Sequence, residues 1–423
     1  MDQNEYCDNI RYEMADLYLE LAKTLYEAGA TVTRVSDSVR WLAENLGDSN
    51  VHVYVGYEAI ELSIQHRDQI ENRLYVLREP FKVNIAVLHQ VSSLMHNLSS
   101  YQGDICAIRD EIYRIQNLKP IYPVPLTILL TSIACAAFGW LNHADILALL
   151  IIFISAFCAL SIKFRYGGRL HNFYISILVA AFSGGIIAAV LTKVFQTQTP
   201  DVALISSILF LIPGFLLINA GLDIIRDHTS CGIVRLTSAF TQVCIISGSL
   251  LIPLGILGNV GFFHGSDMNM FLFIPTMGLA AGLAALGFAL LFNAPLFVLP
   301  GCMICAIAGR LIREVGILFH LDVFFCIFSG MVAATLLATY YGRRTRVPGV
   351  FLAVIAGIPM IPGLAMIEGL QGMFTIAHTG TSISNTVVVY SMQQILYSAV
   401  VSLVLVGGII LPIILIYRKS LRI

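Results

Sequence analysis

The tripeptide Ile-Pro-Gly occurs twice inside long apolar segments, at 212–214 and again at 361–363. Proline removes a backbone donor and clashes with the preceding helical turn, and glycine relaxes the chain, so each Pro-Gly pair predicts a broken helix. A broken helix presents N–H groups and the positive end of a half-helix dipole, both of which suit an anion. We therefore predict that the breaks bind a substrate, with a plain helix kink as the alternative. The residues concerned are Pro213, Gly214, Pro362 and Gly363.

Carboxylates follow both breaks. Asn219 and Asp223 share one helix face after the first break, and Glu368 comes after the second. Carboxylates inside a membrane are costly and commonly functional, and a low dielectric favours their neutral form. We predict Glu368 as the first choice and Asp223 as the second for carrying a coupling proton, and Asn219 as a substrate-binding residue. The alternative for both acids is a hydrated position near a helix end.

Three glutamines lie in apolar segments that follow the two breaks. Gln242 comes after the first break, and Gln393 and Gln394 come after the second, in corresponding neighbourhoods. Such amides either line a cavity or form hydrogen bonds between helices. We include all three as candidate substrate-binding residues.

The elements that hold these residues are apolar enough to lie in a membrane. The chain of 423 residues is 57% apolar and 12% charged, with a mean hydropathy of +0.81. A helix of about 20 residues crosses the hydrocarbon layer. We expect a polytopic α-helical protein in contact with the lipid bilayer. Its ten predicted spans lie near 122–141, 146–162, 172–192, 202–222, 236–258, 270–292, 294–309, 321–341, 348–370 and 385–417.

The repeated tripeptide pairs the fourth predicted span with the ninth, which makes each half of the body five spans long. Because five is an odd number, the second half must enter the membrane from the opposite side. We predict an inverted repeat with broken helices, in membrane parts 121–265 and 266–423. Paired breaks in an inverted repeat indicate a transport site.

Residues 1–120 differ from the rest, with 18 Asp or Glu against 11 Lys or Arg. Periodicity predicts a small cytoplasmic α/β domain, in which Arg34 has a structural role at the turn between the first two helices. An acidic surface repels nucleic acid, so we expect none as a partner. Motifs for nucleotide-driven pumping and zinc hydrolysis are absent, so we expect no cofactor and no metal. The predicted helices are 14–28, 32–46, 83–98 and 105–115, and the predicted strands are 51–55, 60–64 and 74–76.

Positive residues predict the orientation, because cytoplasmic loops are enriched in Lys and Arg. With residues 1–120 in the cytoplasm, the inside loops hold eleven such residues and the outside loops hold three. We expect a multi-pass protein of the cytoplasmic (inner) membrane with both termini inside, and we leave a homo-oligomer open. The inside set is Lys163, Arg165, Arg169, Arg226, Arg235, Arg343, Arg344, Arg346, Arg418, Lys419 and Arg422, and the outside set is Lys193, Arg310 and Arg313.

Several strings carry a family resemblance. They are Gly29-Ala30-Thr31-Val32-Thr33-Arg34-Val35, Leu46-Gly47, the paired β-segments, Val83-Asn84, the two Ile-Pro-Gly segments, the loop from Asp223 to Arg235, and Arg346-Val347-Pro348. Over essentially the whole chain, they resemble the N-terminal domain and the two membrane parts of the threonine/serine exporter family. The resemblance implies a ten-span exporter of small hydroxyl amino acids driven by the proton-motive force. Split two-chain relatives are associated with succinate export.

We therefore expect a secondary active exporter of threonine and serine, working by alternating access with proton antiport. A half-helix N-terminus can take the substrate carboxylate, and Glu368 or Asp223 can take its ammonium. A dicarboxylate needs a second positive group, and no Lys or Arg falls near the middle of a predicted span. A dicarboxylate exporter is thus the alternative. Two alternatives belong to other functional classes: an intramembrane enzyme in which Asp223 and Glu368 act as paired carboxylates, and a ligand-sensing receptor. We expect that the protein is not an enzyme.

Overall fold

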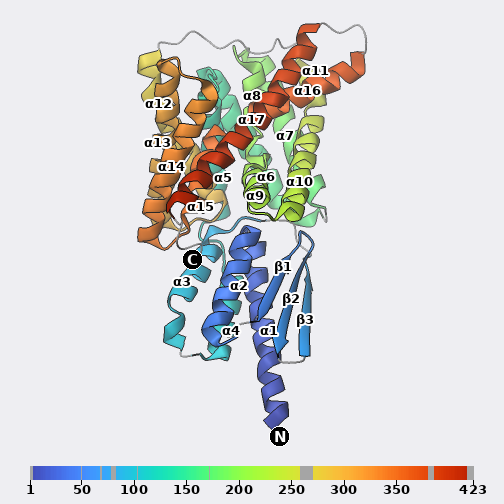
Figure 1. Ribbon diagram of the computed structural model, residues 1–423. Helices are drawn as coiled ribbons and strands as arrows, with labels where there is room; N and C mark the ends of the chain where they lie inside the picture. The colour runs from blue at the N-terminus through green and yellow to red at the C-terminus, as the bar shows by residue number, and fades with distance from the viewer. Residues whose placement is uncertain are drawn as a thin grey trace.

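The computed structural model describes residues 3–48, 50–66, 69–77, 82–101, 103–170, 172–257, 270–379 and 385–416. The N-terminal helices α1–α4 and the three-stranded sheet form a part that we call the head, and the later helices form a bundle. Figure 1 shows the head below one end of the bundle, with α17 running from the far end toward the head. Arg418, Lys419 and Arg422 of the charge count lie outside the described residues.

The head follows the predicted order of elements. Its strands pair antiparallel in the order β1-β2-β3, and β3 begins earlier than the sequence pattern predicts. Thr31 accepts a hydrogen bond from the Arg34 N–H at the start of α2, and Gly47 ends that helix with a φ of 92°, where glycine is favoured. The elements are α1 (Gln3–Glu27), α2 (Val32–Leu46), β1 (Val51–Val55), β2 (Ala59–His66), β3 (Gln69–Val76), α3 (Ile85–His96) and α4 (Ile105–Gln116).

The bundle contains long helices and two interrupted ones. The uninterrupted helices are α5 (Val124–Leu141), α6 (Ile146–Tyr166), α7 (Phe173–Phe195), α10 (Thr229–Ser249) followed by α11 (Leu251–Leu257), α12 (Met270–Leu291), α13 (Leu299–Leu318), α14 (Val323–Thr345) and α17 (Asn385–Ile416). The interrupted ones are α8 (Pro200–Ser206) with α9 (Gly214–Ile225), and α15 (Gly349–Gly357) with α16 (Gly363–Thr379).

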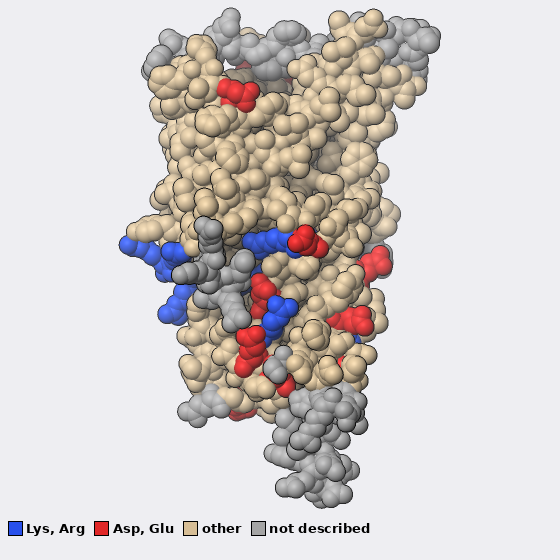
Figure 2. All heavy atoms as spheres, viewed as in Figure 1, with Lys and Arg blue, Asp and Glu red and all other residues tan. Residues whose placement is uncertain are grey.

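The described residues hold eight helices that are long and apolar enough to cross a membrane, or ten spans if each bent pair counts as one. The expectation of a polytopic helical membrane protein is confirmed at this level. Figure 2 shows that charged side chains on the visible face gather over the head and at its boundary with the bundle, whereas the bundle above is nearly free of them. A membrane covers such an apolar surface without cost.

Several residues of the charge count lie in helices rather than in loops, and three arginines among them lie more than one turn from a helix end. Arg310 and Arg313 belong to α13, which continues beyond the predicted span 294–309. Arg235 lies within α10 and is completely buried. Each of them forms an ion pair with an acid, Glu314 for the first two and Asp223 for the third. The charge count that favours a cytoplasmic head therefore rests on fewer loop residues than predicted.

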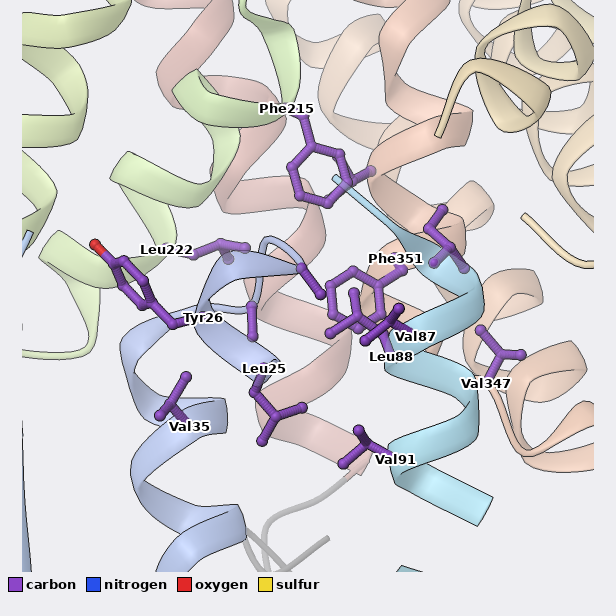
Figure 3. Close-up of a cluster of buried hydrophobic side chains, with 14 of the residues drawn as sticks. Leu25, Tyr26, Val35, Val87, Leu88, Val91, Phe215, Leu222, Val347 and Phe351 are labelled. Atoms are coloured by element: carbon purple, nitrogen blue, oxygen red, sulfur yellow. The ribbon is translucent and has the colours of Figure 1, made fainter. Parts of the chain in front are cut away.

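Head and bundle share one hydrophobic cluster. Figure 3 shows Leu25 of α1 and Leu88 of α3 beside Phe351 of α15, with Phe215 of α9 above them. The rings of Phe215 and Phe351 are stacked with centroids 6.2 Å apart. Apolar area removed from water at this junction stabilises the contact by roughly 25 cal/mol per Å².

A backbone contact also joins α3 of the head to α12 of the bundle. The Ile85 N–H donates to the Phe292 carbonyl at 2.9 Å, and the Ala86 N–H donates to the Asn293 carbonyl at 3.1 Å. Helix starts leave N–H groups without intrahelical partners, and helix ends leave carbonyls. Each helix end here supplies what the other lacks, so the head is fixed to the bundle at a defined angle.

Candidate functional site

Each Ile-Pro-Gly tripeptide forms a tight turn between two helices, and the helices on either side differ in direction by 61° and 53°. Pro213 has φ −78° and ψ 51°, close to an inverse γ-turn. The Gly214 N–H donates to the Ile212 carbonyl at 2.8 Å, and the Gly363 N–H donates to the Ile361 carbonyl at 2.8 Å. The predicted helix breaks are present. The glycine N–H groups are used within the turns, however, and do not remain open for a substrate.

The two breaks pack against each other through reciprocal contacts. A Cβ atom at Gly214 would overlap Cδ1 of Ile361, and a Cβ atom at Gly363 would lie 2.6 Å from Cδ1 of Ile212. Only glycine permits so close an approach without a shift of the neighbouring side chain. A small apolar cavity of about 30 Å³ lies at this crossing, with Phe215 in its lining.

A larger cavity, of about 290 Å³, adjoins the second break, and we call it the break cavity. Polar side chains from α13, α16 and α17 line it, together with Asn142 and two apolar side chains at the C-terminal end of α5. The lining includes Arg310 and Arg313 of α13, Pro362 and Gly363 of the break, Glu368 of α16, and Tyr390 and Gln394 of α17.

The cationic side of the break cavity is an arginine cluster on α13. Arg310 Nε lies 2.7 Å from Glu314 Oε1, and Arg313 Nη1 lies 2.9 Å from the same oxygen. Arg310 Nη1 also donates to the carbonyl of Pro359, in the turn just before the second break, at 3.4 Å. The Arg310 side chain is 8% exposed. An arginine with these partners is held in place, and its planar group suits a carboxylate.

The acidic side of the break cavity is Glu368. This residue is 6% exposed, and its Oε2 accepts a hydrogen bond of 2.7 Å from the Tyr390 hydroxyl. The bond links α16 to α17. The cavity thus presents guanidinium groups from one helix and a carboxylate from another to whatever occupies it.

A second polar cluster, which we call the dock, lies where the α1–α2 turn meets α9 and α10. Asp223 and Arg235 have no exposed side-chain surface, and Arg235 Nη1 lies 2.6 Å from Asp223 Oδ2. The Val32 N–H donates to the other carboxylate oxygen at 3.0 Å. Buried charges require such paired and hydrogen-bonded surroundings.

The carbonyls of the same turn complete the dock. Asn219 Nδ2 donates to the Gly29 carbonyl at 2.9 Å, and Arg235 Nη2 donates to the Ala30 carbonyl at 3.1 Å. The Arg235 guanidinium carbon also lies 4.9 Å from the centre of the Tyr26 ring. Burial raises the pKa of Tyr26 above its usual range, although Arg235 acts in the opposite direction, so the phenol stays neutral. The dock ties the head to the half-helix that follows the first break.

The predicted site residues therefore fall into separate places. Pro362, Gly363, Glu368 and Gln394 meet at the break cavity. Pro213 and Gly214 form the first break, which reaches the crossing but is not among the described lining of that cavity. Asn219 and Asp223 lie in the dock, where their side chains hold the head.

The remaining predicted residues lie apart from the break cavity. Gln393 is exposed on α17, and Gln242 is 8% exposed on α10; neither is among the described residues that line the cavity. Arg34 Nη2 donates to Ser92 Oγ at 3.0 Å, so this arginine connects α2 to α3. The sequence predicts instead that Arg34 holds the turn between the first two helices.

Sequence reasoning missed the arginines and both tyrosines, Tyr390 and Tyr397, of the break cavity. The statement that no Lys or Arg lies near the middle of a span is wrong for α13, because Arg310 lies well inside this helix. The available signal was the spacing of Arg310 and Glu314, an i, i+4 pair that neutralises its own charge on a helix. Tyr390 had a similar signal, since it lies one helical turn before Gln394.

Two family models match the chain. One, described as a putative threonine/serine exporter, matches residues 16–257, and the other, described as threonine/serine exporter ThrE, matches residues 277–416. The chain belongs to the threonine/serine exporter family. The first match includes the dock and the first break, and the second includes Arg310, Arg313, Glu368, Tyr390 and Gln394 of the break cavity. The resemblance drawn from the sequence is thereby confirmed.

The individual proteins to which this family member is similar share less than a third of the aligned residues with it. Proteins named probable succinate transporter subunit YjjP are 27% identical over 150 residues in Klebsiella aerogenes and 29% identical over 158 residues in Escherichia coli strain K12. The matches cover 35% and 36% of this chain and 58% and 59% of the relatives. An uncharacterised Haemophilus influenzae protein is 28% identical over 142 residues, which are 34% of this chain and 47% of that protein. No solved structure matches the chain significantly.

Proposed function

We propose that the chain is a secondary active exporter of threonine and serine, and that the break cavity is its substrate site. The observation that carries this proposal is the placement of Arg310 and Glu368 in one small cavity beside a helix break. A zwitterionic amino acid needs a cation for its carboxylate and an acid for its ammonium group. The cavity of about 290 Å³ is near the lower end of ligand sites, which hold about 300–1,000 Å³, and so favours a small solute.

Each group of the substrate has a counterpart in this site. The Arg310 guanidinium receives the carboxylate by charge-assisted hydrogen bonds, and Glu368 receives the ammonium. Gln394 is available for the side-chain hydroxyl. A side chain longer than that of threonine meets the apolar wall of the cavity.

Proton antiport follows from competition at Glu368. An ionised Glu368 binds the ammonium, and a protonated Glu368 does not. A proton that enters from the outer side protonates Glu368 and so releases the substrate on that side. The carboxyl group then carries this proton to the inner side. The Tyr390 hydroxyl, 2.7 Å from Glu368 Oε2, can accompany either state because a hydroxyl donates or accepts.

Alternating access requires two halves that move relative to each other. The reciprocal contacts of Gly214 with Ile361 and of Gly363 with Ile212 support an inverted repeat whose axis passes near the crossing of the breaks. We propose that the head lies in the cytoplasm. It contacts α9 and α10 of one half and α12 and α15 of the other, so it closes that end of the transporter when docked.

A dicarboxylate such as succinate is the second candidate substrate. The observation in its favour is the pair Arg310 and Arg313, since two guanidinium groups in one cavity can receive two carboxylates. The YjjP relatives are named succinate transporter subunits. Glu368 opposes this candidate when ionised, because it would repel the second carboxylate.

Counterflow into proteoliposomes tests the proposal. Vesicles with the purified full chain are loaded with one unlabelled solute and diluted into the same labelled solute, using threonine, serine, succinate and lysine in turn. We expect labelled threonine and serine to accumulate transiently, and lysine and protein-free vesicles to give no signal. Counterflow of succinate without threonine or serine would replace the first candidate with the second. No counterflow of any of the three would contradict both.

A further inference from the structure

The largest cavity described for this protein lies between head and bundle rather than at the helix breaks. It has a volume of about 630 Å³, and we call it the junction cavity. One wall comes from α2 and α3 of the head, and the other comes from the end of α14 and the start of α15. No residue of the break cavity lines it, so the two are separate sites.

Arginines dominate the charge of the junction cavity. Arg34 and Arg40 line it from the head, and Arg343 and Arg346 line it from the bundle. Asp37 and Glu44 offset part of this charge and leave an excess of positive groups. Arginines that face one another across a cavity repel each other, and an anion between them removes that repulsion.

The inner surface of the junction cavity carries buried hydroxyl groups beside Arg34. Arg34 reaches inward, where its Nη2 donates to Ser92 Oγ at 3.0 Å, and Ser92 is 5% exposed. Ser38, 3% exposed, adds a second hydroxyl to the lining. Trp41 adds a broad apolar surface. Guanidinium and hydroxyl groups are the usual partners of phosphate, and an indole ring packs against a planar or apolar group beside it.

The position of the junction cavity connects it to the transport elements. Its bundle wall includes Val347, Pro348 and Gly349, and α15 begins at Gly349 and leads to the second break. A ligand in this cavity would therefore contact both the head and the start of α15, the helix before the second break. Its binding would favour the arrangement in which head and bundle are joined.

We propose that the junction cavity binds a phosphate-bearing anion, which bridges Arg34 and Arg40 of the head to Arg343 and Arg346 of the bundle. The chemistry is the same whether the phosphate belongs to the headgroup of an anionic lipid or to a free phosphate compound. The cavity lies where the head meets the ends of the membrane helices, within reach of either source. This site is separate from the proposed transport cavity, and its occupancy regulates the head rather than supplying substrate.

Binding measurements on the full chain test this proposal with two probes. Pyrophosphate is titrated by calorimetry into protein in a neutral detergent, and phosphatidylglycerol is compared with phosphatidylcholine by native mass spectrometry. The test variant is the double substitution Arg40→Gln with Arg343→Gln. The matched control is Arg344→Gln, because Arg344 is exposed on the same turn of α14, lies 5.0 Å from the Tyr340 ring, and is not part of the described lining.

We expect wild type and Arg344→Gln to bind at least one probe equally, and the double variant to bind it about tenfold or more weakly, as loss of charge-assisted bonds implies. Pyrophosphate binding identifies a free phosphate compound, and selective retention of phosphatidylglycerol identifies a lipid headgroup. If the double variant does not fold, the single substitution Arg343→Gln gives the same comparison. Failure of both probes to bind wild type, or equal binding by wild type and variant, would overturn the proposal.

Discussion

Asp223 and Glu368 follow equivalent helix breaks, yet their surroundings give them different properties. Asp223 pairs with Arg235 at 2.6 Å and accepts a backbone N–H from the head, with no exposed surface. Glu368 accepts a hydrogen bond from a neutral hydroxyl and lines a cavity. Both oxygens of Asp223 are engaged by the Arg235 guanidinium and the Val32 N–H, so this carboxylate is unsuited to bind and release a substrate in each cycle. We therefore propose that Glu368 couples substrate to proton and that Asp223 holds the head.

The dock predicts a large effect on stability from the single substitution Asp223→Ala. Removing one partner of a buried ion pair leaves the other charge uncompensated, at a cost of about 3–5 kcal/mol. The double substitution Asp223→Leu with Arg235→Met should recover part of this loss, because it removes both charges and keeps the volume. Thermal unfolding of the purified protein measures both. Unfolding of Asp223→Ala at the wild-type temperature would show that the pair does not hold the head.

At the scale of elements, the order of helices and strands could be predicted from periodicity and segment length. The two helix breaks could be predicted as well, because Pro-Gly acts locally on the backbone. The extent of α13 could not, since the apolar run stops at Arg310 and the acid that neutralises it comes one turn later. The Gly29 carbonyl that accepts a hydrogen bond from Asn219 also could not be predicted. It lies 190 residues away in the α1–α2 turn, and only the folded chain brings the two residues together.

The reciprocal crossing of the breaks predicts a specific rescue. Gly214→Val places a side chain against Cδ1 of Ile361, so it should separate the broken helices and lower transport by about tenfold or more. Ile361→Ala in the same chain should restore much of the flux, because it vacates the space that the valine needs. Gly248→Val serves as a control, since a Cβ atom there meets nothing within 4 Å. Equal loss of transport in Gly214→Val and in the double variant would argue against the crossing.

At the scale of the whole molecule, the head joins elements from both halves of the bundle. The dock holds α9 and α10, and the α3 contact holds α12 through the Phe292 and Asn293 carbonyls. In the alternating access that we propose, rocking of the two halves releases or carries one of these attachments. We propose that the head thereby controls the opening of the end on which it lies.

This arrangement requires the α6–α7 and α14–α15 connections to lie on the same side as the head. Single cysteines in a cysteine-free background, labelled in intact cells with an impermeant reagent, measure the orientation. We expect Arg169→Cys and Arg344→Cys to react only after the cells are opened, and Leu321→Cys, in the α13–α14 connection, to react at once. All three positions are exposed, so accessibility to the reagent reports the side of the membrane. Labelling of Arg169→Cys from outside would reverse the proposed orientation.

Threonine flux driven by an imposed pH gradient in proteoliposomes tests directly whether Glu368 couples substrate to proton inside the break cavity. We predict that the gradient drives threonine in wild type and that Glu368→Gln abolishes this response while the protein remains folded. Two neighbours on α17 serve as controls: Gln393→Ala should leave the flux unchanged, whereas Gln394→Ala, in the cavity lining, should lower it. An undiminished pH-gradient response in Glu368→Gln would contradict the account.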